Sequence, residues 1–157
     1  MKNNIKNTSY INHEIVLTPA TTGVRFFTSV DSGSYVTTHW HRAIEIIYIQ
    51  SGSLTVTIES HTRELSAGQC ILINSNIMHS TKCTAPNTAI VFQIPTDFAE
   101  TYIPNIHSLV FHINDETTDP KKITKINILK NTLEKMQVAN DIQPDGFLLV
   151  FNSLLFD

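Results

Sequence analysis

Cysteine is scarce in this chain of 157 residues, which holds only Cys70 and Cys83. Two thiols are too few for a disulfide scaffold, so we expect both to be free in a reducing compartment. The chain also lacks an apolar run of about 18 residues, which a membrane-spanning helix would need. Its polar start, MKNNIKNTSY, has no hydrophobic segment typical of a signal peptide. These absences predict a cytoplasmic protein with no membrane contact.

Positive charge is in short supply as well. The 11 lysine and arginine residues stand against 14 acidic residues, which gives a formal net charge of −3. This balance provides no general attraction for a phosphate backbone, so we do not expect the chain to bind nucleic acid by itself. Glycine-rich phosphate loops, nucleophile elbows and paired cysteine motifs are absent too. Any contact with DNA would require a domain that is missing from this chain.

What is present predicts a mainly β domain. Hydrophobic residues make up 41% of the chain, enough for one domain with a core of its own. Short stretches rich in Ile, Val, Phe and Thr recur between turn signals, which is typical of a closed or sandwiched β body such as a jelly roll. The expected strands cover residues 13–17, 24–30, 35–49, 54–58, 70–73, 89–94 and 109–113.

The composition changes near residue 117. Asp119 and Pro120 are a good helix start, and apolar residues recur from Ile123 to Met136 at helical spacing, so we expect a helix over 120–138. A second, very apolar helix is expected from Gly146 to the end, where its bare apolar terminus favours a partner or a continuation of the chain. The predicted organisation is a mobile arm over 1–12, a β-barrel over 13–116 and a two-helix segment over 117–157.

Candidate metal ligands occupy odd positions of the expected strand over 35–49. Alternate side chains of a strand point to the same face, so His39, His41 and Glu45 can enter one cavity. His79 follows the strand over 70–73 and is the candidate fourth ligand. Three imidazoles and a carboxylate suit iron, manganese, nickel, copper or zinc better than magnesium or calcium. The pattern leaves open which ion binds, and whether a metal fills the cavity at all.

Other polar and aromatic residues admit two interpretations each. Arg25 lies between apolar neighbours, where its guanidinium either binds a carboxylate or phosphate ligand in the barrel or stays solvated at an edge. Trp40 and Tyr48 have the opposite parity from the candidate ligands, which favours packing over ligand stacking. The remaining histidines are expected to be ordinary core or surface residues: His13, His61, His107 and His112.

The spacing of the candidate ligands resembles that of a known family. Gly33, five residues, His39, one residue, His41, three residues, Glu45, six residues and Gly52 match the first cupin motif at every fixed position. The second motif matches in part, because Gly68 and His79 are in place while Asn74, Asn76 and Cys83 stand where cupins usually have other residues. Within the cupins, the run HWHRAIEIIYI is most similar to the N-terminal sensor domain of AraC-type transcription regulators.

This resemblance implies a cupin jelly-roll barrel followed by two C-terminal α-helices. It further implies that the barrel senses a small-molecule effector, with or without a divalent metal such as Zn, Fe, Mn or Ni, and that the helices form a homodimer. On this interpretation the chain is not an enzyme. The alternative is a free-standing metal-dependent cupin enzyme, such as an oxygenase, decarboxylase or isomerase. A third interpretation is a purely structural dimerisation module with an empty barrel.

Overall fold

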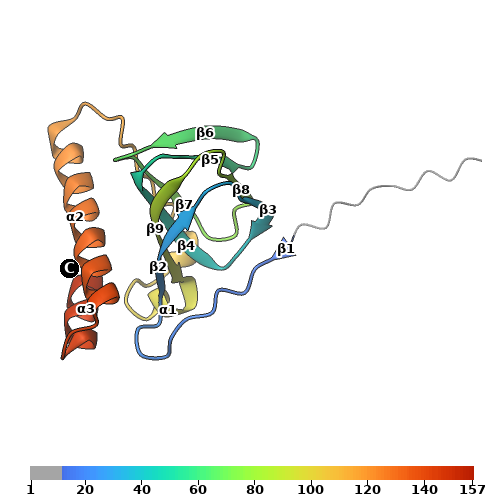
Figure 1. The fold of residues 1–157 in the computed structure, drawn as a ribbon. Coiled ribbons are helices and arrows are strands. Elements are labelled where there is room, and N and C mark those ends of the chain that lie inside the picture. Colours follow the sequence, from blue (N-terminus) through green and yellow to red (C-terminus); the bar gives the residue numbers. More distant parts are fainter. Residues whose placement is uncertain (1–11) are drawn as a thin grey trace, which may run out of the picture.

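The computed structural model describes residues 12–157, so the arm expected over 1–12 lies almost wholly outside the described residues. Two β-sheets form the body of the protein (Figure 1). The five-stranded sheet has the order β1 (Asn12–His13), β3 (Tyr35–Trp40), β8 (His79–Lys82), β5 (Ser53–Ile58), β6 (His61–Ser66). The four-stranded sheet has the order β2 (Arg25–Asp31), β9 (Asn87–Pro95), β4 (Ala43–Ser51), β7 (Cys70–Ile73).

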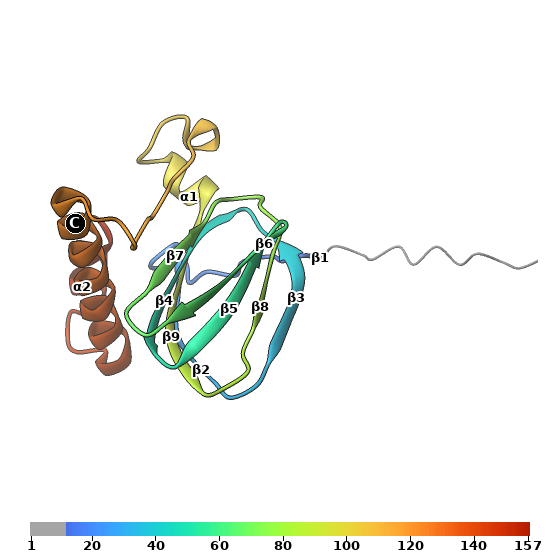
Figure 2. The same ribbon diagram turned by 90° about the horizontal axis from the view of Figure 1, so that it is seen from above.

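The helices follow the strands along the chain. A short helix α1 (Thr96–Glu100) and a 3-10 turn η1 (Ile106–Ser108) come directly after β9, and the longer helices α2 (Pro120–Ile142) and α3 (Phe147–Leu155) form a C-terminal hairpin. This hairpin lies on one side of the barrel (Figure 2). The prediction of a mainly β jelly-roll barrel followed by two helices is therefore confirmed.

The interior between the two sheets is filled by alternate residues of the strands. Ile47 and Ile49 of β4 meet Leu54 and Val56 of β5 there, and none of the four is more than 9% exposed. Gly52 makes the turn between these strands with φ 74°, and a side chain at this position would collide with Pro86 O. The hairpin predicted at this glycine is thus required by both its backbone angle and the close approach of another loop.

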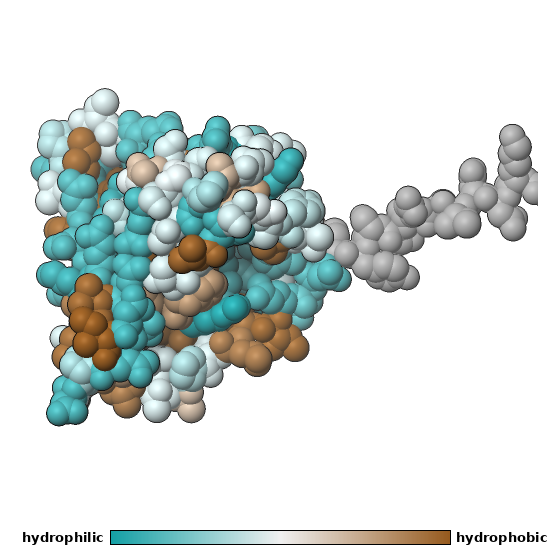
Figure 3. All heavy atoms as spheres, in the orientation of Figure 1, coloured by the Kyte–Doolittle hydropathy of each residue, from teal (hydrophilic) through white to brown (hydrophobic). Residues whose placement is uncertain are grey.

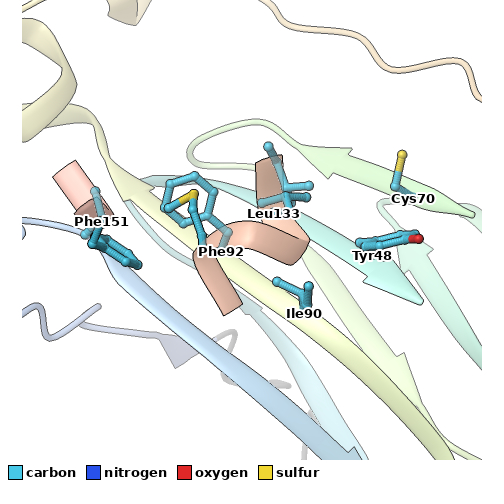
Figure 4. Packing of buried hydrophobic residues seen from close by; sticks show 9 residues of the cluster. Tyr48, Cys70, Ile90, Phe92, Leu133 and Phe151 are labelled. Carbon is cyan, nitrogen blue, oxygen red and sulfur yellow. The ribbon is translucent and has the colours of Figure 1, made fainter. Parts of the chain in front are cut away.

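The outer face of the four-stranded sheet is covered by the helical hairpin. Tyr48, Ile90 and Phe92 point away from the barrel interior and pack against Leu133 of α2 and Phe151 of α3 (Figure 4). This burial on both faces explains why seven consecutive residues of β4, Ala43 to Ile49, are all buried. Helix α2 begins where the sequence predicts, because the Asp119 carboxylate accepts a hydrogen bond from Lys121 N–H at 2.9 Å.

Two expected strands are wrong. The stretch 109–113 forms no strand, because the Asn74 amide group takes both backbone hydrogen bonds of Phe111, at 2.9 and 3.0 Å, in place of a neighbouring strand. The stretch 13–17 pairs only through Asn12 and His13, and Ile15 and Leu17 are exposed. Strand β8, in contrast, was not expected, because its polar sequence HSTK carries no hydrophobic pattern.

The described helices are all too short or too polar to cross a membrane.

Candidate metal centre

The candidate ligands do not lie on one continuous strand. The prediction of a single strand over 35–49 is therefore wrong. His39 belongs to β3 in the five-stranded sheet, His41 lies in the link, and Glu45 belongs to β4 in the four-stranded sheet. The chain changes sheets between Trp40 and Ala43, because a jelly roll joins strands of opposite layers. The inward parity is kept across this crossing, so the three side chains still reach one space.

The site is built from two transverse rows of residues that face each other. In the five-stranded sheet, His39 of β3 is directly opposite His79 of β8. In the four-stranded sheet, Arg25 of β2 is opposite Gln93 of β9, which is opposite Glu45 of β4. Because directly opposite residues of neighbouring strands share a face, each row delivers its side chains together.

All three histidines are oriented by the backbone in the same way. The Nδ1 atom of each lies within hydrogen-bond distance of a carbonyl oxygen two residues away: His39 with Thr37 O at 2.9 Å, His41 with Ala43 O at 3.0 Å and His79 with Ile77 O at 2.9 Å. A carbonyl oxygen only accepts, so Nδ1 carries the proton in each ring. Nε2 is therefore the atom of each ring that is directed away from the backbone.

The three rings converge on one point. Their metal-binding atoms all lie within 4.8 Å of one another, and His39, His41 and His79 are the cluster of this kind found among residues 12–157. His79 Nε2 is buried and has no hydrogen-bond partner in the described part of the chain. Burial lowers the pKa of His79, which keeps this nitrogen unprotonated near neutral pH. A buried lone pair without a partner is costly unless a cation or water meets it, so the residues present fit a metal ion.

Glu45 lies beside this cluster and is not a member of it. One carboxylate oxygen, Oε2, accepts hydrogen bonds from His41 Nε2 at 3.0 Å and from Gln93 Nε2 at 2.6 Å. Burial raises the pKa of Glu45, but these two hydrogen bonds outweigh it and the pKa is lowered. Burial likewise lowers the pKa of His41, and the Glu45 carboxylate reverses this to a raised pKa. Glu45, predicted as a ligand, is paired with His41 in this structure.

His39, His79 and Glu45 line a cavity of about 230 Å³ together with Arg25. Arg25 Nη1 donates to Gln93 Oε1 at 3.2 Å and to Glu14 Oε1 at 3.0 Å. One wall is apolar and includes Phe27, Ile47, Leu54, Ala89 and Val91. The space therefore combines the guanidinium of Arg25, imidazole nitrogens, apolar side chains and the carboxylates of Glu14, Asp31 and Glu45.

Two residues of the site were not found from the sequence. Gln93 lies in the apolar stretch over 89–94. A single polar residue in such a stretch is a weak indication that its side chain belongs to a site. Glu14 precedes the motif by many residues and reaches the cavity only because β1 pairs with β3. No local spacing encodes that pairing.

The other candidates lie outside the cavity. Trp40 stacks on His13 with ring centroids 4.2 Å apart, and Tyr48 packs towards the helices, as their parity predicts. His61 and His112 are exposed, and His107 lies 3.3 Å from the Glu100 carboxylate on the surface. Both cysteines are buried and free.

Residues 26–95 match the family model described as Cupin domain. This match covers the strands from β2 to β9 apart from Arg25, includes all three histidines, Glu45 and Gln93, and agrees with the cupin prediction for these residues. It does not reach the helical hairpin. A comparison with curated proteins gave no match.

Several solved structures are similar to part of this chain. One is the DMSP lyase DddQ from Ruegeria pomeroyi, with 26% identity and a TM-score of 0.43 over 46% of this chain and 39% of that chain. Another is a predicted oxalate decarboxylase from Thermotoga maritima, with 24% identity and a TM-score of 0.43 over 46% of this chain and 68% of that one. A cupin superfamily protein from Desulfitobacterium hafniense gives 11% identity and a TM-score of 0.46 over 52% and 74%.

These neighbours correct one prediction. The resemblance to sensor domains implied that the chain is not an enzyme, yet the similar structures include a DMSP lyase and a predicted oxalate decarboxylase. Since one fold carries unrelated functions, the exclusion does not follow from the fold. The identities are low, so the comparisons assign no activity to this chain either.

Proposed function

We propose that the barrel holds a divalent transition metal on His39, His41 and His79 and binds a small anionic molecule beside it. The observation that carries this proposal is the buried Nε2 of His79, which has no partner among the described residues and points towards two further imidazole nitrogens. Three imidazoles suit zinc, iron, manganese or nickel. Such an ion, when bound, would act as a Lewis acid that fixes and polarises an oxygen atom of the ligand.

The remaining residues of the cavity would bind and orient that molecule. Arg25 supplies a planar cation for a carboxylate or phosphate, and the apolar wall excludes water from the rest of the ligand. Gln93 holds Arg25 and Glu45 in place through its two amide atoms. Glu45 orients His41, and it is a candidate fourth ligand whose carboxylate would have to leave His41 Nε2.

Cobalt titration tests the metal site. Wild type should bind one equivalent of Co²⁺ with visible absorption bands. His79→Ala should weaken Co²⁺ binding by roughly a hundredfold or more, because removing a ligand should reduce metal affinity at least as much as removing a residue that only orients a ligand. The matched control is His61→Ala, which removes an exposed histidine of β6. Equal affinity in wild type and His79→Ala would reject the proposal.

For the whole protein, we infer that the metal cupin is the effector-sensing and dimerisation domain of an AraC-type transcription regulator in the cytoplasm. Two features support this inference. Helices α2 and α3 pack directly on strands that line the cavity from the other side, so a ligand has a route to the hairpin. The hairpin also exposes apolar side chains at Val138, Ile142, Leu149 and Val150. Brown patches mark this helical side in Figure 3. A homodimer would cover them.

The second candidate is a metal-dependent cupin enzyme. A donor set of three imidazoles is favourable for it, since catalytic sites keep positions free for substrate. A turnover screen of the cobalt- or iron-loaded chain against small carboxylates separates the two candidates. Turnover that is lost in His41→Ala supports the enzyme. Ligand-dependent dimerisation, together with a basic helix-turn-helix segment encoded after Asp157, supports the regulator.

A further inference from the structure

A carboxylate of the chain itself lies at the mouth of the cavity. Glu14 follows β1, and its Oε1 accepts a hydrogen bond from Arg25 Nη1 at 3.0 Å. Its other oxygen, Oε2, lies 3.3 Å from His39 Nε2. One carboxylate therefore bridges the cationic group of the cavity and one of the three nitrogens that converge in it. This bridge is the arrangement that a small external carboxylate would make.

Arg25 does not depend on Glu14 for its position. Its Nη1 also donates to Gln93 Oε1 at 3.2 Å, and the guanidinium lies 4.8 Å from the centre of the Phe27 ring. Gln93 is fixed in turn by its hydrogen bond of 2.6 Å to Glu45. The guanidinium would therefore stay directed into the cavity if Glu14 left it.

The segment that carries Glu14 is attached by few contacts. Strand β1 has two residues, followed by one hydrogen bond from Glu14 N–H to Trp40 O at 2.9 Å. His13 stacks on Trp40, while Ile15 and Leu17 are 72% and 78% exposed. The Glu14 side chain is 35% exposed, and exposed ion pairs are weak. Opening of this segment should therefore cost little free energy.

The charges of the cavity favour replacement of Glu14 by an external anion over the binding of an additional anion. The carboxylates of Glu14, Asp31 and Glu45 line the cavity together with the guanidinium of Arg25. A divalent cation on neutral histidines would, together with Arg25, balance these three negative charges. An added anion would leave one negative charge in excess, whereas an external monocarboxylate that replaces Glu14 keeps the balance. The volume of about 230 Å³ also limits the ligand to a small molecule.

We propose that Glu14 is a built-in carboxylate that fills the ligand position of this cavity, and that a small external monocarboxylate competes with it for Arg25 beside the proposed metal site. The inference rests on the proposed metal-dependent binding function. It adds the chemical class of the ligand and an internal competitor that sets its affinity.

Acetate binding to the zinc-loaded chain tests this competition by calorimetry at constant ionic strength. Glu14→Ala should bind acetate roughly five- to tenfold more tightly than wild type, because the weak internal competitor is gone. The matched control, Glu64→Ala, removes an exposed glutamate of β6 and should equal wild type. Adding Arg25→Ala to Glu14→Ala should abolish the gain, and neutral acetamide should show none. Equal acetate affinity in Glu14→Ala and wild type would overturn the proposal.

Trp40, the one tryptophan of the chain, reports the displacement itself. Acetate that displaces Glu14 should disturb the adjacent stacking of His13 on Trp40, so tryptophan emission should change with the same midpoint as the calorimetric curve. Acetate binding without a change in emission contradicts displacement. Zinc stoichiometry is measured first. If zinc fails to bind, the proposed metal site fails, and the same acetate comparison on the metal-free chain decides the competition.

Discussion

The two sheets of the barrel differ both in how they are covered and in what they contribute to the site. The four-stranded sheet is buried on both faces, between the barrel interior and the helical hairpin, and it contributes Arg25, Gln93 and Glu45. The five-stranded sheet has an exposed outer face, where the first four residues of β3 are all exposed, and it contributes His39 and His79. Most of the packing energy and the metal ligands thus belong to different layers.

Stability and metal binding should therefore be separable by mutation. Substitutions between the four-stranded sheet and the hairpin should lower stability strongly, whereas substitutions on the outer face of the five-stranded sheet should lower it little.

Phe151→Ala should destabilise the protein by about 3–5 kcal/mol, because it empties a fully buried site between α3 and the four-stranded sheet. Phe151 is 2% exposed and meets the Phe26 ring edge-on with centroids 5.6 Å apart. Urea unfolding measures the loss. Ser153→Ala is the control on the same helix, where the side chain is exposed and the change should be close to zero. Equal effects of the two variants would contradict the packing of α3 on the sheet.

Asp115→Asn should lower the free energy of unfolding by about 1–3 kcal/mol, because Asp115 joins the two sheets to the connector before α2. Its carboxylate accepts hydrogen bonds from Arg63 Nη2 of β6 at 2.8 Å and from Cys70 N–H of β7 at 2.7 Å, and its side chain is 1% exposed. Glu116→Gln is the control, because Glu116 pairs with the same arginine at 3.0 Å but is 68% exposed. A loss in the control as large as in Asp115→Asn would contradict this role.

The contribution of Asp115 should also depend on pH. Burial raises the pKa of Asp115, but the hydrogen bonds from Arg63 and Cys70 N–H outweigh it and the pKa is lowered. A lowered pKa in the folded state means that the stabilisation is complete above the unfolded value of about 3.9 and is lost as pH falls through the folded value. The difference in unfolding free energy between wild type and Asp115→Asn should therefore shrink below about pH 4. A difference that grows on acidification would refute the assignment.

Thr55→Val should change stability by less than about 0.5 kcal/mol, because Thr55 lies on the outer face of β5. The control is the reverse change one residue along, Val56→Thr, which places a hydroxyl in the barrel interior where Val56 is 1% exposed. That variant should lose about 1–3 kcal/mol. If thermal melting shows the two variants to be equally stable, the contrast between the faces of this sheet is wrong.

The sequence predicted the barrel, both long helices and the convergence of the site, because each depends on local period and on motif spacing. His39, His41, Glu45 and His79 do reach one region, although the single strand assumed for three of them is two strands in different sheets. Pairings between distant segments were beyond prediction. Glu14 reaches the cavity because β1 pairs with β3, and Phe111 is held by the Asn74 side chain. Strand β8 forms between β3 and β5 despite its polar sequence.

His39, His41 and His79 should bind one ion through their Nε2 atoms, while backbone carbonyls hold their Nδ1 protons. Long-range ¹H–¹⁵N NMR of the imidazole rings tests it most directly, in the metal-free protein and with one equivalent of zinc. We predict that zinc shifts the Nε2 resonances of His39, His41 and His79 and leaves their Nδ1 atoms protonated, with no change at His61. Unshifted Nε2 resonances, or zinc bound through Nδ1, would contradict the account.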